Sequence, residues 1–183
     1  RNIIKANNIA KPEARVITVT SGKGGVGKSN IAVNLAVQFQ RMGLKTIIFD
    51  ADIGLANVEV MFGTIPQYSL NDLIYHDKEI EDIITDGPEV GFISGGSGIM
   101  GLSNLTLDQI SYLVKSVEKL SVIADIVIVD TGAGISDSVM EFVASSPEIL
   151  LVTTPEPSSL TDAYSLLKML YRNPKYDKNE SVI

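Results

Sequence analysis

Residues 22–29 read GKGGVGKS and match the spacing GxxxxGK(S/T), in which each residue type can help to hold phosphate groups. Glycines let the backbone curl so that several N–H groups face an anion, and a following helix adds the positive end of its dipole. Lys28 supplies a flexible charge for the β and γ phosphates of a nucleotide, and the Ser29 hydroxyl can ligate Mg²⁺. We therefore expect ATP and Mg²⁺ at this loop. The residues expected around the phosphates are Gly22, Lys23, Gly24, Gly25, Val26, Gly27, Lys28, Ser29 and Asn30.

Aspartates close two apolar runs further along the chain. Residues 45–50 (KTIIFD) and 125–130 (DIVIVD) each end in a carboxylate, and Asp52 lies two residues after the first run. In doubly wound folds, ligands collect at the carboxyl edge of the sheet. A carboxylate beside a triphosphate can hold Mg²⁺ through water or orient an attacking water, so Asp52 and Asp130 join Ser29 as candidate magnesium ligands. Taken alone, an aspartate at a strand end is more often a turn or cap residue.

The elements that must position these residues alternate between strands and helices. The predicted strands are 15–20, 45–50, 90–94, 125–130 and 149–153, and the predicted helices are 28–42, 136–145, 158–171 and one beginning at Thr106. Two or three short helices are expected in 55–84, and a loop is expected directly after Asp130. Apolar strands separated by helices predict an α/β fold of the P-loop NTPase type, with a mostly parallel sheet and helices on both faces.

Length and composition favour one globular domain. The 183 residues are 45% hydrophobic and 20% charged, which excludes extended disorder. We expect an N-terminal arm or short helix at 1–14 and a P-loop ATPase domain at 15–183. That domain is expected to be truncated at its C-terminus, because the final NESVI resembles the opening of another strand.

Charge and cysteine content narrow the choice of partners. The net charge of -7 gives no general attraction to nucleic acid, and the absence of cysteine excludes disulfides and thiolate metal sites. No apolar run is long enough for a membrane span and no signal peptide is evident, so we expect a cytosolic protein.

The KGGVGK(S/T) segment resembles the deviant P-loop of the MinD/ParA superfamily of ATPases. The resemblance implies an ATP-dependent homodimer in which Lys23 reaches the nucleotide of the partner subunit. In a single subunit, Lys23 is expected to point away from the phosphates. Lys23 and Lys28 are then candidate catalytic residues, because both would neutralise charge on the transferring phosphoryl group.

Two further segments are similar to the switches of this superfamily. DADIGLAN matches the first switch, DxDxGxxN, which implies that Asp52 positions the hydrolytic water and that Asp50 supports it. DTGAG matches the second switch, which implies that Asp130 is an outer-shell magnesium ligand and Gly132 senses the γ-phosphate. By the same resemblance, the PEPSS loop touches nucleotide across the dimer, which makes Glu156 a weaker candidate; alternatively, Ser158 or Ser159 caps a helix there.

The segments DTGAGIS, DADIGLANVEVMFG and TPEPSSLTDAYSLLK look most like the FlhG branch (also FleN or YlxH), which sets flagellar number and position. The resemblance implies the flagellar GTPase FlhF and flagellar switch-complex proteins as partners. Members of this branch often begin with a DQAxxLR element and end with an amphipathic membrane-targeting helix. Neither is present in this sequence, although Arg1 could be the last residue of a truncated DQAxxLR.

Several alternatives remain at this point. The chain could be a nucleotide-gated scaffold with negligible hydrolysis, a MinD-type cell-division ATPase, a ParA-type DNA-partitioning ATPase, or a phosphoryl transferase of the dethiobiotin synthetase type. The nitrogenase iron proteins and iron–sulfur carriers of the superfamily need cysteines that this sequence lacks. His76 is expected to be a solvated surface residue.

Overall fold

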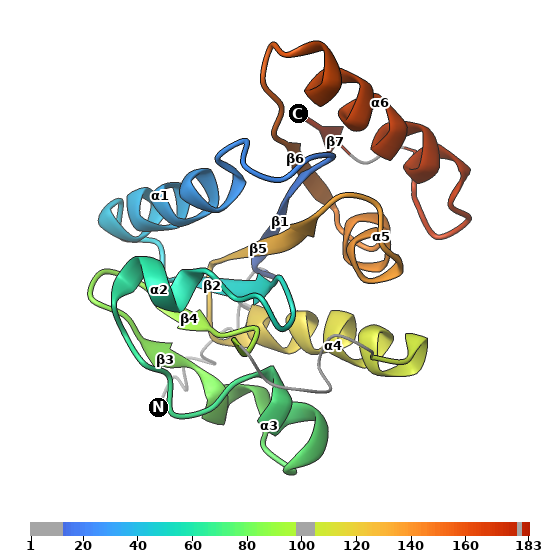
Figure 1. The fold of residues 1–183 in the computed structure, drawn as a ribbon. Helices are drawn as coiled ribbons and strands as arrows, with labels where there is room; N and C mark the ends of the chain where they lie inside the picture. The colour runs from blue at the N-terminus through green and yellow to red at the C-terminus, as the bar shows by residue number, and fades with distance from the viewer. Residues whose placement is uncertain (1–12, 98–104, 179–180) are drawn as a thin grey trace, which may run out of the picture.

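A single twisted sheet with helices on both faces makes up the computed structural model, which describes residues 13–97, 105–178 and 181–183 (Figure 1). The strands lie in the order β3-β4-β2-β5-β1-β6-β7, and every adjacent pair is parallel except β3 with β4. The predicted α/β class is confirmed. The strands are β1 (Arg15–Ser21), β2 (Thr46–Ala51), β3 (Thr85–Asp86), β4 (Gly91–Ile93), β5 (Ile126–Ala133), β6 (Glu148–Leu151) and β7 (Ser181–Val182).

The helices form two layers because successive strand residues face opposite sides of the sheet. Ile48 packs in one apolar cluster with α1 and α2, whereas Ile47 and Phe49 pack in another with α3 and α4. None of the described helices is long and apolar enough to cross a bilayer. The helices are α1 (Lys28–Arg41), α2 (Val58–Phe62), α3 (Leu70–Tyr75), α4 (Leu107–Lys119), α5 (Asp137–Ala144) and α6 (Pro157–Arg172), with 3₁₀ turns at Ile80–Ile83 and Leu120–Val122.

The second switch segment differs from its predicted form. We expected a loop after Asp130, but β5 continues through Ala133. The strand is extended because Thr131 pairs with the end of β2 and Ala133 pairs with Ser21 across a register shift. Gly132 therefore lies in strand β5, at its carboxyl end, and not in a loop.

Other departures from the sequence analysis are small. The antiparallel strand β3 was not predicted, because two residues give no periodic signal. The predicted terminal strand is present as β7. Residues 1–12 lie outside the described part of the chain, so the division between an arm and a domain stays a prediction.

Because β1, β2, β5 and β6 are parallel, the segments that leave their carboxyl ends lie at one edge of the sheet. The phosphate-loop sequence follows β1, the DADIGLAN sequence follows β2, and the PEPSS sequence follows β6. Three motifs are thus brought to one edge, although Lys23 in the first and Glu156 in the last are 133 residues apart in the sequence.

The phosphate loop begins with a close backbone contact. A Cβ atom added at Gly22 would lie 2.3 Å from the carbonyl carbon of Asp162 and 2.6 Å from the nitrogen of Ala163, both in α6. In contrast, a Cβ added at Gly24 would meet its nearest neighbour, the Cβ of Ala133, at 4.0 Å. Gly22 is therefore required for packing against α6, whereas Gly24 has room for a side chain.

This difference predicts opposite outcomes for two alanine substitutions. Gly22→Ala should lower the free energy of unfolding by about 1–3 kcal/mol, because α6 or the loop must shift to admit the methyl group. Gly24→Ala should change it by less than about 0.5 kcal/mol. Urea denaturation of the nucleotide-free protein measures both values, and equal stabilities for the two variants would contradict the assignment.

Candidate functional site

A cavity of about 460 Å³ opens at the carboxyl edge of the sheet, between the phosphate loop and α2. Seven of the residues predicted from sequence line it together, which places the loop and the first switch around one space. These seven are Gly24, Gly25, Gly27, Lys28, Ser29, Asn30 and Asp52.

The amino end of α1 is open toward this cavity. Gly27 is the N-cap residue and adopts φ 91°, and no side chain caps the helix. Gly25 also has a positive φ, 78°, a conformation that only glycine adopts easily. The first turn of α1 contains no acidic residue. Its free N–H groups and its dipole are therefore available to an anion.

Lys28 and Asp130 form a buried ion pair at the floor of the cavity. The Lys28 Nζ lies 2.5 Å from Asp130 Oδ1, with side-chain exposures of 8% and 0%. The same ammonium lies 3.3 Å from the Ser29 hydroxyl. The charge of the phosphate-loop lysine is thus neutralised by Asp130, one of the predicted magnesium ligands.

The second carboxylate oxygen of Asp130, Oδ2, is buried and has no hydrogen-bond partner among the described residues. No three His, Cys, Asp or Glu residues in the described chain are grouped to hold a metal ion by themselves. Mg²⁺ commonly keeps several waters and uses few protein ligands beside substrate phosphates. The Ser29 hydroxyl and Asp130 Oδ2 fit an ion of that kind.

Asp50 organises the segment that follows β2. It is fully buried, and its carboxylate accepts hydrogen bonds from the backbone N–H groups of Asp52, Asn57 and Val58 at 2.9–3.1 Å. Burial raises the pKa of Asp50 to about 7, the charge of Asp130 acts in the same direction, and the three backbone donors oppose the shift. The loop that carries Asp52 is thereby tied to the sheet at both of its ends.

Asp52, in the first switch, lies beside Gly132 of the second switch. Its Oδ2 accepts a hydrogen bond from the Asn57 side chain at 3.4 Å, and its Oδ1 lies 3.2 Å from where a Cβ would stand on Gly132. Burial raises the pKa of Asp52 above its usual value, the Lys28 charge lowers it, and the Asp130 charge raises it. Asp52 therefore faces both Gly132 and the space above the phosphate loop.

Lys23 lies outside the cavity lining. Its Nζ contacts Glu156 Oε2 at 3.2 Å and the Ser158 hydroxyl at 3.1 Å. The two charged side chains are 40% and 65% exposed, and exposed ion pairs of this kind contribute little to stability. Lys23 can therefore change partner at small cost, while its role across a dimer stays a prediction.

Some predicted residues have other surroundings. Gly22 packs on α6, and Val26 is partly buried against the α1 cluster. The expectation that Ser158 or Ser159 caps α6 is wrong. Glu156 occupies the N-cap position and Pro157 follows it, because proline is favoured in the first helical turn.

The sequence analysis missed several residues that line the cavity. Val60 and Met61 of α2 are 72% and 38% exposed at its rim, and Ser21, Asn57 and Ala133 also contribute. Asn57 is the final residue of the DxDxGxxN pattern and could have been named from it. Val60 and Met61 are apolar residues outside any phosphate-binding motif, so only the fold shows that they line the cavity.

Comparison with known families supports this arrangement. The family model described as ParA, NUBPL iron-transfer P-loop NTPase, matches residues 13–174. The chain is 43% identical over 160 residues to the antiactivator FleN of Pseudomonas aeruginosa, covering 87% of this chain and 57% of that protein. It is 39% identical over 165 residues to the flagellum site-determining protein YlxH of Helicobacter pylori, covering 89% and 56%. The chain thus spans little more than half the length of these relatives.

Solved structures of MinD proteins have the same fold. The septum site-determining protein MinD of Pyrococcus horikoshii, in complex with Mg-ADP, superimposes with a TM-score of 0.73 at 28% identity, covering 87% of this chain and 65% of that one. The MinC:MinD complex of Aquifex aeolicus gives 0.75 at 28% identity, covering 92% and 67%. Because the family match spans most of the described residues and includes both switches, the chain belongs to the ParA/MinD family of P-loop NTPases.

Proposed function

We propose that this chain binds MgATP, dimerises around it and hydrolyses it, and that the whole protein uses this switch to regulate flagellar number or placement. The observation that carries the biochemical part is the buried Lys28–Asp130 pair beneath an open helix terminus and a glycine-rich loop. The flagellar part is supported by the similarity to FleN and YlxH.

In this proposal, phosphate oxygens bind to the N–H groups at the amino end of α1 and draw Lys28 away from Asp130. Ser29 would hold Mg²⁺ through its hydroxyl, and Asp52 and Asp130 would hold it through ordered water. The ion supplies charge neutralisation for the phosphates. Lys28 and Asp130 each exchange one partner for another, so neither charge is left alone in the buried site.

Hydrolysis requires a water aligned with the γ-phosphorus. Asp52 would accept a hydrogen bond from that water, whose oxygen bonds to phosphorus as the bond to the bridging oxygen of ADP breaks and whose proton passes to the released phosphate. The Gly132 N–H responds to the γ-phosphate, and Lys28 with the partner's Lys23 neutralises the developing charge. A cation supplied by a partner in this way can be worth about 10³–10⁵ in rate.

Dimerisation would use residues that the single subunit leaves accessible. Lys23 leaves Glu156 and Ser158 to reach the partner's nucleotide, and Glu156 becomes free to contact that nucleotide as well. By family resemblance the partners of the dimer are FlhF and flagellar switch-complex proteins. We also propose that the protein acts in the cytoplasm and, by family resemblance, that an amphipathic helix of the full-length protein provides peripheral membrane association.

One prediction from this mechanism concerns Asp52, the proposed water-positioning residue. Asp52→Asn should lower kcat for ATP by at least about 10²-fold, since the amide orients and deprotonates water poorly, while the affinity for ATP changes little. Asp86→Asn, an exposed aspartate on β3, is the matched control and should keep normal turnover. Phosphate release by the full-length protein measures both, with partners present. Unchanged turnover in Asp52→Asn would reject this mechanism, and turnover equal to a no-enzyme blank in the wild type would favour a scaffold.

A second prediction separates the two lysines. Lys28→Ala should abolish nucleotide binding, whereas Lys23→Ala should bind ATP in the monomer within about threefold of wild type but lose ATP-dependent dimerisation and turnover. Lys45→Ala, an exposed lysine, is the control. Light scattering of the full-length protein with ATP gives the mass. A normal dimer formed by Lys23→Ala would show that this lysine does not act in trans.

The cellular role has its own test. Cells that lack the gene should show an altered number or position of flagella by electron microscopy, and a copy with Asp52→Asn should fail to restore the normal pattern. Misplaced division septa with normal flagella would instead indicate a MinD-type role. Salt-sensitive DNA binding by the purified protein would indicate ParA-type partitioning.

A further inference from the structure

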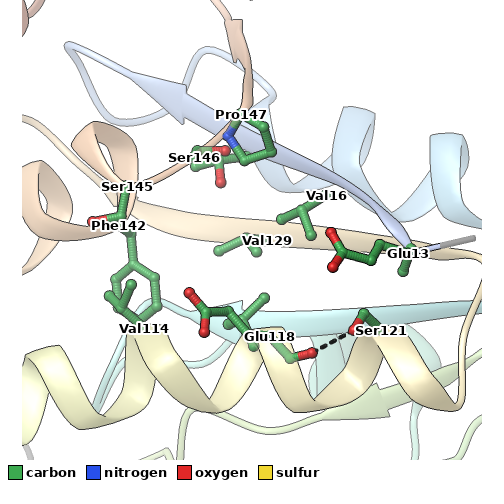
Figure 2. Close-up of a pocket in the computed structure, with 13 residues that line it drawn as sticks. Glu13, Val16, Val114, Glu118, Ser121, Val129, Phe142, Ser145, Ser146 and Pro147 are labelled. Atoms are coloured by element: carbon green, nitrogen blue, oxygen red, sulfur yellow. Dashed lines mark hydrogen bonds between the residues drawn. The ribbon is translucent and has the colours of Figure 1, made fainter. Parts of the chain in front are cut away.

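A second cavity, of about 530 Å³, lies between α4, α5 and the sheet toward the amino ends of β1 and β6 (Figure 2). It shares no lining residue with the cavity at the phosphate loop. We call it the α4–α5 groove. The ATPase mechanism described above makes no use of it.

The groove has an apolar floor that the two helices leave partly open. Val16 of β1 and Val129 of β5 form the sheet side, and Val114 and Phe142 form the helix side. Val16 and Val114 are only partly buried, although each packs against the main apolar cluster. An apolar segment that filled the groove would remove this surface from water.

Two carboxylates border this floor. Glu13 lies before β1 and Glu118 lies near the end of α4, and Figure 2 shows both directed into the space between these elements. None of the described residues that line the groove is a lysine, arginine or histidine. The nearby Arg15 is paired with Glu148 through two contacts of 2.6 Å. The groove therefore favours an occupant that is apolar and positively charged.

We propose that residues 1–12 of the same chain bind in the α4–α5 groove. Their sequence, RNIIKANNIAKP, contains three positive charges, three isoleucines and no acidic residue, so it complements both the floor and the carboxylates. The segment is joined to Glu13, which itself lines the groove, so its local concentration there is in the millimolar range typical of short tethers. In the proposed arrangement the isoleucines would pack on the valines, and the basic side chains would lie near Glu13 and Glu118.

The bound segment would contact both α4 and α5 and so stabilise their packing. Since α5 begins just after the segment that carries Gly132, occupancy of the groove supports the second switch from the far side of the sheet. The proposal does not depend on the proposed ATPase activity, and its test uses no nucleotide.

Disulfide trapping tests the proposal, because the sequence has no cysteine of its own. In the intact chain, Ile4→Cys is combined with Ser121→Cys, which lines the groove, or with Val122→Cys, which does not line it and is 76% exposed. Under mild oxidation the Ser121 pair should cross-link at least about tenfold faster than the Val122 pair, as tethering near one partner implies. Mass spectrometry of the intact protein measures the bond.

Charge reversal provides a second readout on the same pair. Glu118→Lys should slow the Ser121 cross-link at least about threefold, and Glu81→Lys, at an exposed site outside the lining, should leave it unchanged. If Ser121→Cys impairs folding, Ser145→Cys on the opposite wall replaces it. Equal rates for groove and control positions, or no effect of Glu118→Lys, would overturn the proposal and leave the groove to another occupant.

Discussion

The buried ion pair between Lys28 and Asp130 is the interaction on which the rest of the site depends. Leaving one member of such a pair without a partner costs about 3–5 kcal/mol. A ligand that takes Lys28 from Asp130 must therefore bring a negative group for the lysine and a positive or hydrogen-bonding group for the aspartate. MgATP brings both together. The pair thus favours joint binding of phosphate and Mg²⁺ over binding of either one alone.

The surrounding backbone holds the groups that would act on this ligand. Asp50 accepts three backbone hydrogen bonds and fixes the loop of Asp52, while the extended β5 holds Gly132 beside the Asp52 carboxylate. The two switch segments are therefore in contact with each other. If one switch segment moved, the other would have to move as well, because Asp52 and Gly132 are in close contact.

The motif residues were predictable because their chemistry requires particular types at fixed spacing. The glycine-rich loop, Lys28, Asp52 and Asp130 were identified in this way, and the order of apolar runs predicted the parallel sheet. Contacts between distant segments were not predictable. Gly22 is required by its close contact with α6, and the end of β5 is set by pairing with β1 and β2. Val60 lines the cavity because of the position of α2. These features depend on neighbours that no local pattern specifies.

The two cation pairs near the loop differ in a way that suits a switch. Lys28 and Asp130 are almost fully buried, so their attraction is strong and is replaced only by a ligand of matching charge. Lys23 and Glu156 are largely exposed, so solvent screens their attraction and either can leave without a large penalty. A subunit built in this way responds to nucleotide at the buried pair first. In the proposed mechanism the exposed pair then selects a second subunit, so dimerisation would follow nucleotide binding rather than precede it.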